Sequence, residues 1–120
     1  MKSINLGLRF LLELCTWAAP AFWAWYNLEA WPKYLLIFLG PLSFMLVWAI
    51  FNVPNDPSRG GKAPIIVAGK IRLGIEMLQF CAAAVLYFNL GYHQFTLVFV
   101  LALILHHILL KDRLIWIWKQ

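Results

Sequence analysis

The chain has 120 residues, of which 63% are hydrophobic and only 12% are charged. A soluble domain averages about 45–50% apolar and about 25% charged residues, so this composition excludes an ordinary water-soluble domain and indicates lipid as the solvent. Aromatic residues make up 17%, with seven Trp, as in proteins whose aromatic belts lie at membrane interfaces. The formal net charge of +5 does not indicate nucleic-acid binding, because the basic residues lie in short segments between hydrophobic runs.

Four hydrophobic runs follow one another along the chain, and a helix needs about 20 apolar residues to cross a bilayer. We predict transmembrane helices over residues 4–26, 34–51, 71–89 and 95–110. A cytoplasmic loop over residues 52–69 contains turn-forming Pro and Gly, and a basic tail over residues 111–120 has the composition of an interfacial anchor. The predicted fold class is therefore an all-α membrane protein with a single domain of four transmembrane helices.

The distribution of Lys and Arg predicts how these spans are oriented. With four spans, the N-terminus, the segment between the second and third spans, and the tail share one side of the membrane. That side carries seven basic residues, which are Lys2, Arg59, Lys62, Lys70, Lys111, Arg113 and Lys119. The other side carries only Lys33. Because cytoplasmic segments are enriched in Lys and Arg, we expect both termini in the cytoplasm.

A short charged pattern occurs twice. Arg9 precedes Glu13 by four positions inside the first run, and Arg72 precedes Glu76 by four positions at the start of the third. The first and third runs point the same way, so the pattern predicts two hairpins in a parallel repeat about a pseudo-two-fold axis along the membrane normal. The second arms of the two hairpins share no comparable identity, so a chance match remains an alternative.

The two Arg–Glu patterns are the candidate site, because ionisable residues within membrane helices are expensive and are functional candidates by default. Polar residues extend each helical stripe, and a pair of His lies near the end of the fourth run. These secondary candidates are Thr16, Gln79, His106 and His107. The four charges either fasten the first helix to the third, line a polar cavity for a proton, ion or small ligand, or pair only within their own helices.

Crossed ion pairs follow from the repeat. Arg placed four residues before Glu is the less favourable order for an isolated pair within one helix. Two parallel helices related by a two-fold axis instead place Arg9 beside Glu76. The same symmetry places Arg72 beside Glu13, which gives reciprocal charge-assisted bonds. We expect Gly74 to leave room for this close approach of the two helices.

No motif in the sequence indicates soluble-type catalysis. The chain contains no Gly-rich phosphate loop, no nucleophilic Ser motif and no paired-His motif of a metalloprotease. Cys15 and Cys81 lie in apolar runs without metal-ligand spacing, and no further ligand accompanies the His pair. We therefore expect neither an enzyme nor a protein that holds a cofactor or a metal.

Three stretches resemble a known family. They are Asn5-Leu6-Gly7-Leu8-Arg9-Phe10-Leu11-Leu12-Glu13-Leu14, then Trp48-Ala49-Ile50-Phe51 followed by Pro54, and Arg72-Leu73-Gly74-Ile75-Glu76 followed by Cys81-Ala82-Ala83-Ala84. These residues resemble the YrdB-like family of small bacterial membrane proteins, a domain of unknown function, over nearly the whole chain. The resemblance implies a four-helix protein of the bacterial cytoplasmic membrane, and it implies no activity.

Two function classes remain open. The first is a structural or partner-binding membrane subunit that contains intramembrane Arg–Glu pairs. The second is a minimal proton- or ion-coupled transporter of small molecules that acts as an oligomer, because four helices rarely enclose a substrate path alone. The expected partners are the lipid bilayer and either a second copy of the chain or a larger membrane protein. The residues name neither a substrate nor a physiological role.

Overall fold

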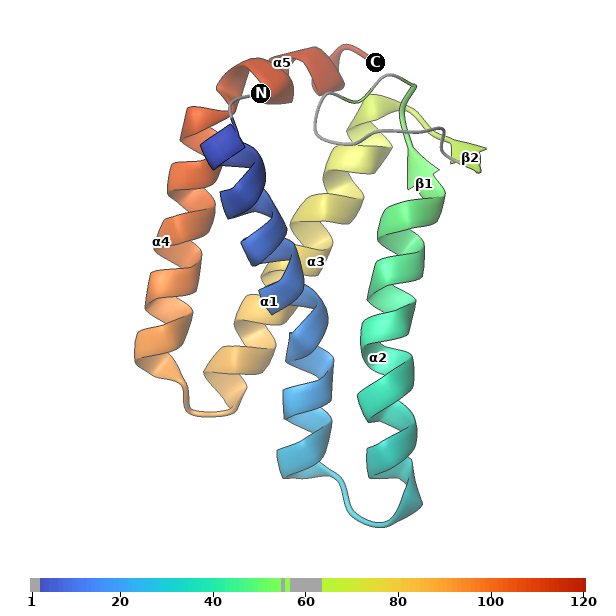
Figure 1. Ribbon diagram of the computed structural model, residues 1–120, viewed down its shortest axis with the longest axis vertical. Helices are drawn as coiled ribbons and strands as arrows, with labels where there is room; N and C mark the ends of the chain where they lie inside the picture. Colours follow the sequence, from blue (N-terminus) through green and yellow to red (C-terminus); the bar gives the residue numbers. More distant parts are fainter. Residues whose placement is uncertain (1–2, 55, 57–63) are drawn as a thin grey trace.

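Helices account for most of the chain that the computed structural model describes, which is residues 3–54, 56 and 64–120 (Figure 1). In chain order the elements are α1 (Ser3–Asn27), α2 (Trp31–Ile50), β1 (Phe51–Asn52), β2 (Ile65–Ile66), α3 (Gly69–Asn89), α4 (His93–Leu109) and α5 (Lys111–Trp118). The two short strands form one parallel pair, and everything else that is regular is helical. The predicted all-α fold class is therefore confirmed.

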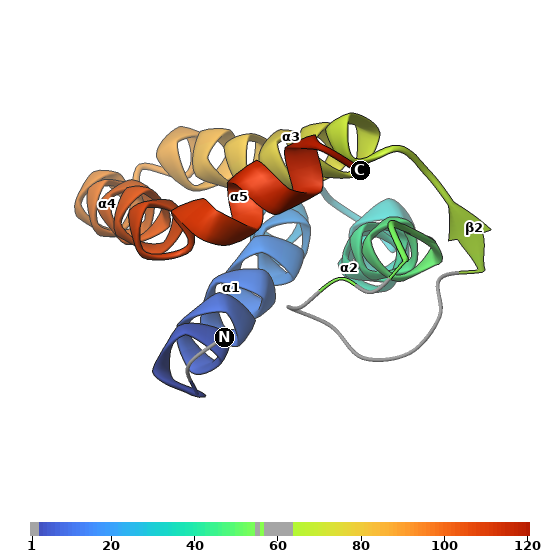
Figure 2. The same cartoon turned by 90° about the horizontal axis from the view of Figure 1, so that it is seen from above.

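The four long helices run alternately down and up, so α1 and α3 point the same way, and the start of α1 and the C-terminus lie at one end of the bundle (Figure 1). We call this end the α5 end, because α5 extends across it from α4 towards the start of α3 (Figure 2). The chain bends by 72° between α4 and α5. Tight turns join the helices at the opposite end, where Ala30 (φ 61°) and Gly91 (φ 84°) have positive φ angles, which L-residues rarely adopt.

Two of the described helices, α2 and α3, are long and apolar enough to cross a membrane. The bent pair of α4 and α5 makes a third when it is counted as one span. By itself α4 has 17 residues, fewer than the roughly 20 that a typical span takes. Two or three spans are therefore supported, and the four-span topology, the internal repeat and the cytoplasmic termini stay predictions.

The helices begin and end within a few residues of their predicted bounds. α2 begins at Trp31, three residues before the predicted start, because Pro32 suits the first helical turn, where its missing N–H is not needed. The predicted basic tail is the helix α5, and it buries Arg113 and Ile117, which lie four residues apart on one face. The tail thus packs onto the bundle as well as carrying charge.

The segment predicted as a cytoplasmic loop closes through the strand pair. Phe51 pairs with Ile65 and Asn52 pairs with Ile66, which brings the end of α2 and the approach to α3 side by side. Within the predicted loop, residues 55 and 57–63, which include Arg59 and Lys62, lie outside the described residues, as does Lys2. The orientation prediction depends on these positions and is not tested by the structure.

Glycines mark two close approaches of the backbone. A Cβ added to Gly40 of α2 would lie 2.7 Å from the Cβ of Pro20 in α1, and one added to Gly69 would lie 1.5 Å from the carbonyl oxygen of Ile117. The first contact seats α2 against α1, and the second seats α5 against the start of α3. The expectation for Gly74 is wrong, because no atom of another described element lies within 4 Å of a Cβ built there.

An aromatic core lies between the helices. Trp48, Phe80, Tyr87 and Phe99 are at most 4% exposed, and the Tyr87 hydroxyl donates a hydrogen bond to the Cys15 carbonyl, which ties α3 to α1. Edge-on contacts between neighbouring rings, such as the 5.4 Å separation of the Trp48 and Phe80 centroids, fill the space. This core lies next to the charged residues described below.

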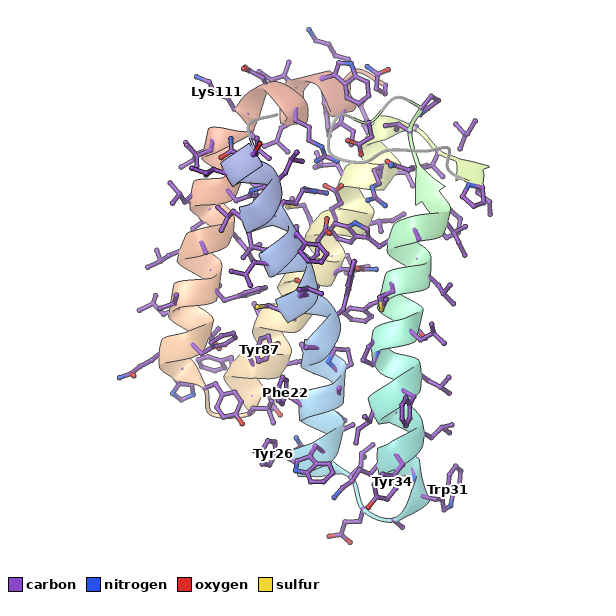
Figure 3. All side chains as sticks on the ribbon, in the orientation of Figure 1. Phe22, Tyr26, Trp31, Tyr34, Tyr87 and Lys111 are labelled. Carbon is purple, nitrogen blue, oxygen red and sulfur yellow. The ribbon has the colours of Figure 1, made fainter. Side chains whose placement is uncertain are left out.

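Large apolar side chains also cover the outside of the bundle. Phe38 is 75% exposed and Leu78 is 71% exposed, and many others exceed one third. In Figure 3 the labelled aromatic residues Tyr26, Trp31 and Tyr34 lie at the end opposite α5, while Lys111 lies at the α5 end. An apolar exterior with aromatic residues near one end suits a lipid environment with an interfacial aromatic belt.

Candidate functional site

A carboxylate in α3, Glu76, is the centre of the site. The residue is completely buried, and its Oε1 accepts hydrogen bonds from Arg9 Nη2 at 2.7 Å and Arg72 Nε at 3.1 Å. Arg113 of α5 approaches the same carboxylate with two nitrogens, Nη2 at 2.8 Å from Oε1 and Nη1 at 3.2 Å from Oε2. Three guanidinium groups from three helices therefore share one buried carboxylate.

Arg113 also binds a second carboxylate. Its Nε donates to Asp56 Oδ1 at 3.1 Å and its Nη2 donates to Asp56 Oδ2 at 2.8 Å. Burial alone would lower the pKa of Arg113, but hydrogen bonds to Asp56 and Glu76 outweigh burial and raise that pKa above its ordinary value. Arg113 is therefore a permanent cation that joins the tail helix, the segment after β1, and α3.

Arg72 joins α3 to the end of α2. Its Nη1 donates to the carbonyl oxygens of Trp48 and Phe51, both at 2.6 Å. The last carbonyls of a helix have no partner within the helix and carry partial negative charge, so a buried cation is a suitable partner. The Trp48 ring adds to this contact, because its centroid lies 4.9 Å from the Arg72 guanidinium carbon and 5.3 Å from that of Arg9.

Glu13 is not equivalent to Glu76. Its Oε1 lies 3.2 Å from Arg9 Nε, and its side chain is 14% exposed. It lines a groove of about 420 Å³ between α1 and α2, together with Trp17, Met45 and other apolar residues. The two copies of the Arg–Glu pattern thus provide one carboxylate, Glu76, with hydrogen bonds to both oxygens, and one, Glu13, that lines a groove.

The prediction of crossed pairs is half correct. The contact between Arg9 and Glu76 is confirmed at 2.7 Å. The predicted contact between Arg72 and Glu13 does not form. No ion pair among the described residues joins them, and Arg72 pairs with Glu76 of its own helix instead. Arg72 directs its Nη1 to the carbonyl oxygens of Trp48 and Phe51, at the end of α2 and the start of β1.

We call these six residues the charge cluster: Arg9, Glu13, Asp56, Arg72, Glu76 and Arg113. It contains three cations and three anions and is therefore neutral as a unit. All members except Glu13 are at most 6% exposed. A buried pair is weak evidence for stability by itself, but removal of one partner typically costs about 3–5 kcal/mol, since it strands a charge.

The secondary polar candidates have mainly local partners. The Thr16 hydroxyl donates to the Leu12 carbonyl within α1 at 2.7 Å, and Gln79 Nε2 donates to the Phe44 carbonyl at 3.1 Å, which joins α3 to α2. His107 Nδ1 lies 2.7 Å from the Leu103 carbonyl. His106 is completely buried rather than exposed at an interface, and neither of its ring nitrogens has a hydrogen-bond partner among the described residues.

The sequence pattern does not mark two members of the charge cluster as site residues. Arg113 belongs to the predicted basic tail, and Asp56 is one of the turn-forming residues of the predicted loop. The spacing of Arg113 and Ile117 is a signal for the first, because it places one cation on the apolar face of an amphipathic tail helix. No comparable signal marks Asp56, which has neither helical nor strand periodicity around it.

Fold and site together define a small all-α protein whose apolar helices suit a membrane and whose buried charges cancel. The family model described as "Protein of unknown function (DUF2568)" matches residues 7–104. The chain is also 39% identical over 121 aligned positions to the uncharacterized protein YrdB of Bacillus subtilis strain 168, and the match covers 100% of this chain and 98% of that protein. The chain therefore belongs to this YrdB-like family of unknown function. No solved structure matches it.

Proposed function

We propose that this chain is a non-enzymatic, multi-pass protein of the bacterial cytoplasmic membrane that serves as a structural or partner-binding subunit. The observation that carries the proposal is Glu76, which is completely buried and whose two oxygens accept hydrogen bonds from three arginines. A carboxylate held in this way is suited to fastening helices together. It is poorly suited to exchanging a proton or ion with each side of a membrane, because such exchange requires access.

The membrane placement is supported by the exterior of the bundle. Of the residues in the most apolar part of α2, only 11% are buried inside the protein, so much of this helix is exposed although one side of it packs against α1. In a four-span arrangement α1 and α4 cross the bilayer beside α2 and α3, with the charge cluster near the cytoplasmic surface. The exposed face of α2 then meets either lipid, a second copy of the chain or a larger membrane protein.

The proposal is tested by measuring both stability and proton flux in one variant. Glu76→Gln leaves three buried guanidinium groups with one carboxylate fewer. We therefore expect the unfolding free energy to fall by about 3–5 kcal/mol, so that the protein unfolds in detergent at a clearly lower temperature. Glu29→Gln is the matched control, because Glu29 is exposed in the turn after α1 and should leave stability unchanged. A Glu76→Gln protein that unfolds normally but loses proton flux in liposomes would contradict the proposal.

Glu13 favours a second candidate function, that of an ion- or proton-coupled carrier acting as an oligomer. This carboxylate is the least buried member of the charge cluster, and it lines the groove between α1 and α2. A carrier carboxyl must gain and lose a proton, which an infrared titration of the carboxyl stretch detects directly. A band that changes between about pH 5 and 9 and disappears in Glu13→Gln would favour the carrier, and no change over this range would favour the structural subunit.

A further inference from the structure

A second groove is formed by other helices than the Glu13 groove. It runs between α3 and α4, reaches the start of α5, and has a volume of about 580 Å³. Small-molecule sites typically have volumes of about 300–1,000 Å³ and apolar walls with a few polar groups. Apolar residues such as Phe80, Leu103 and Ile104 form this wall, and the polar residues His107 and Lys111 lie at the α5 end.

The dimensions of the groove match one leaflet of a bilayer. Its wall extends along α4 from Val100 to Ile108, a separation of eight positions and therefore about 12 Å at the rise of an α-helix. One leaflet contributes about 15 Å of hydrocarbon, which is half of a core about 30 Å thick. An apolar channel of this length with a cation at one end has the shape of a site for an amphiphile.

The charge balance of the molecule makes this end attractive to anions. Because the charge cluster is neutral, the net charge of +5 comes from the rest of the chain. There, seven Lys and Arg outnumber two acids, Glu29 and Asp112. Lys111 is exposed, and it forms no ion pair with a carboxylate of the described residues. An exposed cation at the mouth of an apolar groove complements an anionic headgroup attached to an acyl chain.

We propose that the groove between α3 and α4 binds one acyl chain of an anionic phospholipid, with the lipid phosphate at Lys111. His107 also lines the groove, but its Nδ1 is bonded to the Leu103 carbonyl and its Nε2 is buried, so the polar contact to the headgroup is that of Lys111. Phosphatidylglycerol, an anionic phospholipid, is the lipid that tests the site.

The inference rests on the membrane placement proposed above, but not on the role of the charge cluster. Native mass spectrometry of the detergent-purified protein tests it with phosphatidylglycerol and with phosphatidylcholine that has the same acyl chains. We expect one phosphatidylglycerol to bind about fivefold more tightly, which corresponds to one favourable charge contact at the membrane surface. Equal binding of the two lipids would overturn the proposal.

Two charge variants separate a built site from general attraction. Lys111→Gln should remove the preference for phosphatidylglycerol. Lys119→Gln removes the same charge from the same end of the protein, but Lys119 does not line the groove, so the preference should remain. If both variants lose the preference equally, the lipid is attracted by the basic end as a whole and the proposed site is refuted.

Cys81 supplies an independent readout, because it lines the groove and is exposed. In a Cys15→Ala background Cys81 is the single thiol, and its reaction with a maleimide in detergent should slow severalfold when phosphatidylglycerol is added. Slowing by both lipids alike, or an unchanged rate, would count against the site. If the protection of Cys81 instead increases with protein concentration and dimers appear in the mass spectrum, a second copy of the chain occupies the groove. Normal lipid selectivity in Glu76→Gln would show that the two proposals stand separately.

Discussion

Arg113 of the tail helix and Glu76 of α3 form a two-point contact, with nitrogen–oxygen distances of 2.8 and 3.2 Å, inside the end of the bundle. The same guanidinium binds Asp56 through two further hydrogen bonds. A planar guanidinium suits such shared binding, because its donors are fixed in one plane and grip carboxylates in pairs. The tail is therefore part of the fold and closes the charge cluster from the α5 end.

Replacement of Arg113 should destabilise the protein strongly. Arg113→Gln leaves two buried carboxylates with one cation fewer, at a cost of about 3–5 kcal/mol. Arg113→Lys should recover only part of this loss, because an ammonium group cannot reproduce the two paired contacts. Thermal or denaturant unfolding in detergent measures both, with Lys119→Gln, at an exposed position just after α5, as the control. Equal stability of Arg113→Gln and Lys119→Gln would show that the contact contributes nothing.

The contribution of Arg113 should not vary with pH in the neutral range. Its pKa is raised in the folded protein, so the stabilisation is complete at every pH below the unfolded-state pKa and is lost only in strong alkali. The difference in unfolding free energy between the wild-type protein and Arg113→Lys should therefore stay constant from about pH 6 to 9, since both cations keep their charge there. A difference that changes steeply within this range would mean that a partner carboxylate titrates.

Two glycines on α3 should respond oppositely to the same substitution. Gly69→Ala places a Cβ 1.5 Å from the Ile117 carbonyl oxygen, so α5 must move away from α3. Gly74→Ala adds a methyl group in open space and removes backbone freedom from the unfolded chain, which stabilises a helix by about 0.5–1 kcal/mol. Hydrogen exchange of the α5 amides should rise in Gly69→Ala and remain low in Gly74→Ala. Unchanged exchange in Gly69→Ala would contradict the close packing of α5 against Gly69.

The four-span topology predicts opposite locations for two reporter fusions. A fusion after Leu28, in the turn between α1 and α2, should report the outside of the cytoplasmic membrane, and a fusion after Lys62 should report the cytoplasm. The asymmetry of Lys and Arg is the physical basis of this expectation. An external signal after Lys62 would mean that the number of spans or their orientation is wrong.

Much of the fold follows from patterns that are local in sequence. The hydrophobic runs and the breakers Pro and Gly place all four long helices within a few residues of their bounds. The Arg–Glu pattern also predicts the contact between Arg9 and Glu76, because two charges in parallel apolar helices have few other partners. Periodicity within one helix thus carries information about the helix next to it.

The rest of the site depends on contacts that periodicity does not encode. Arg113 joins Glu76 across 37 positions and Asp56 across 57, and both contacts arise from how the tail folds back over the bundle. The Gly74 expectation is wrong for the same reason, since a small residue marks a close approach only if its face meets a neighbour. That face is set by tertiary packing, which instead places the close approaches at Gly40 and Gly69.

The central claim is that Glu76 fastens α1 to α3 through Arg9, and a double-mutant cycle tests it most directly. Arg9→Gln and Glu76→Gln each strand a buried partner, so each should lower the unfolding free energy by about 3–5 kcal/mol. Measured in detergent by chemical unfolding, the double variant should lose less than the sum of the two by about 0.5–3 kcal/mol, because it removes both charges together. Strictly additive losses would contradict the claim and leave each charge acting alone.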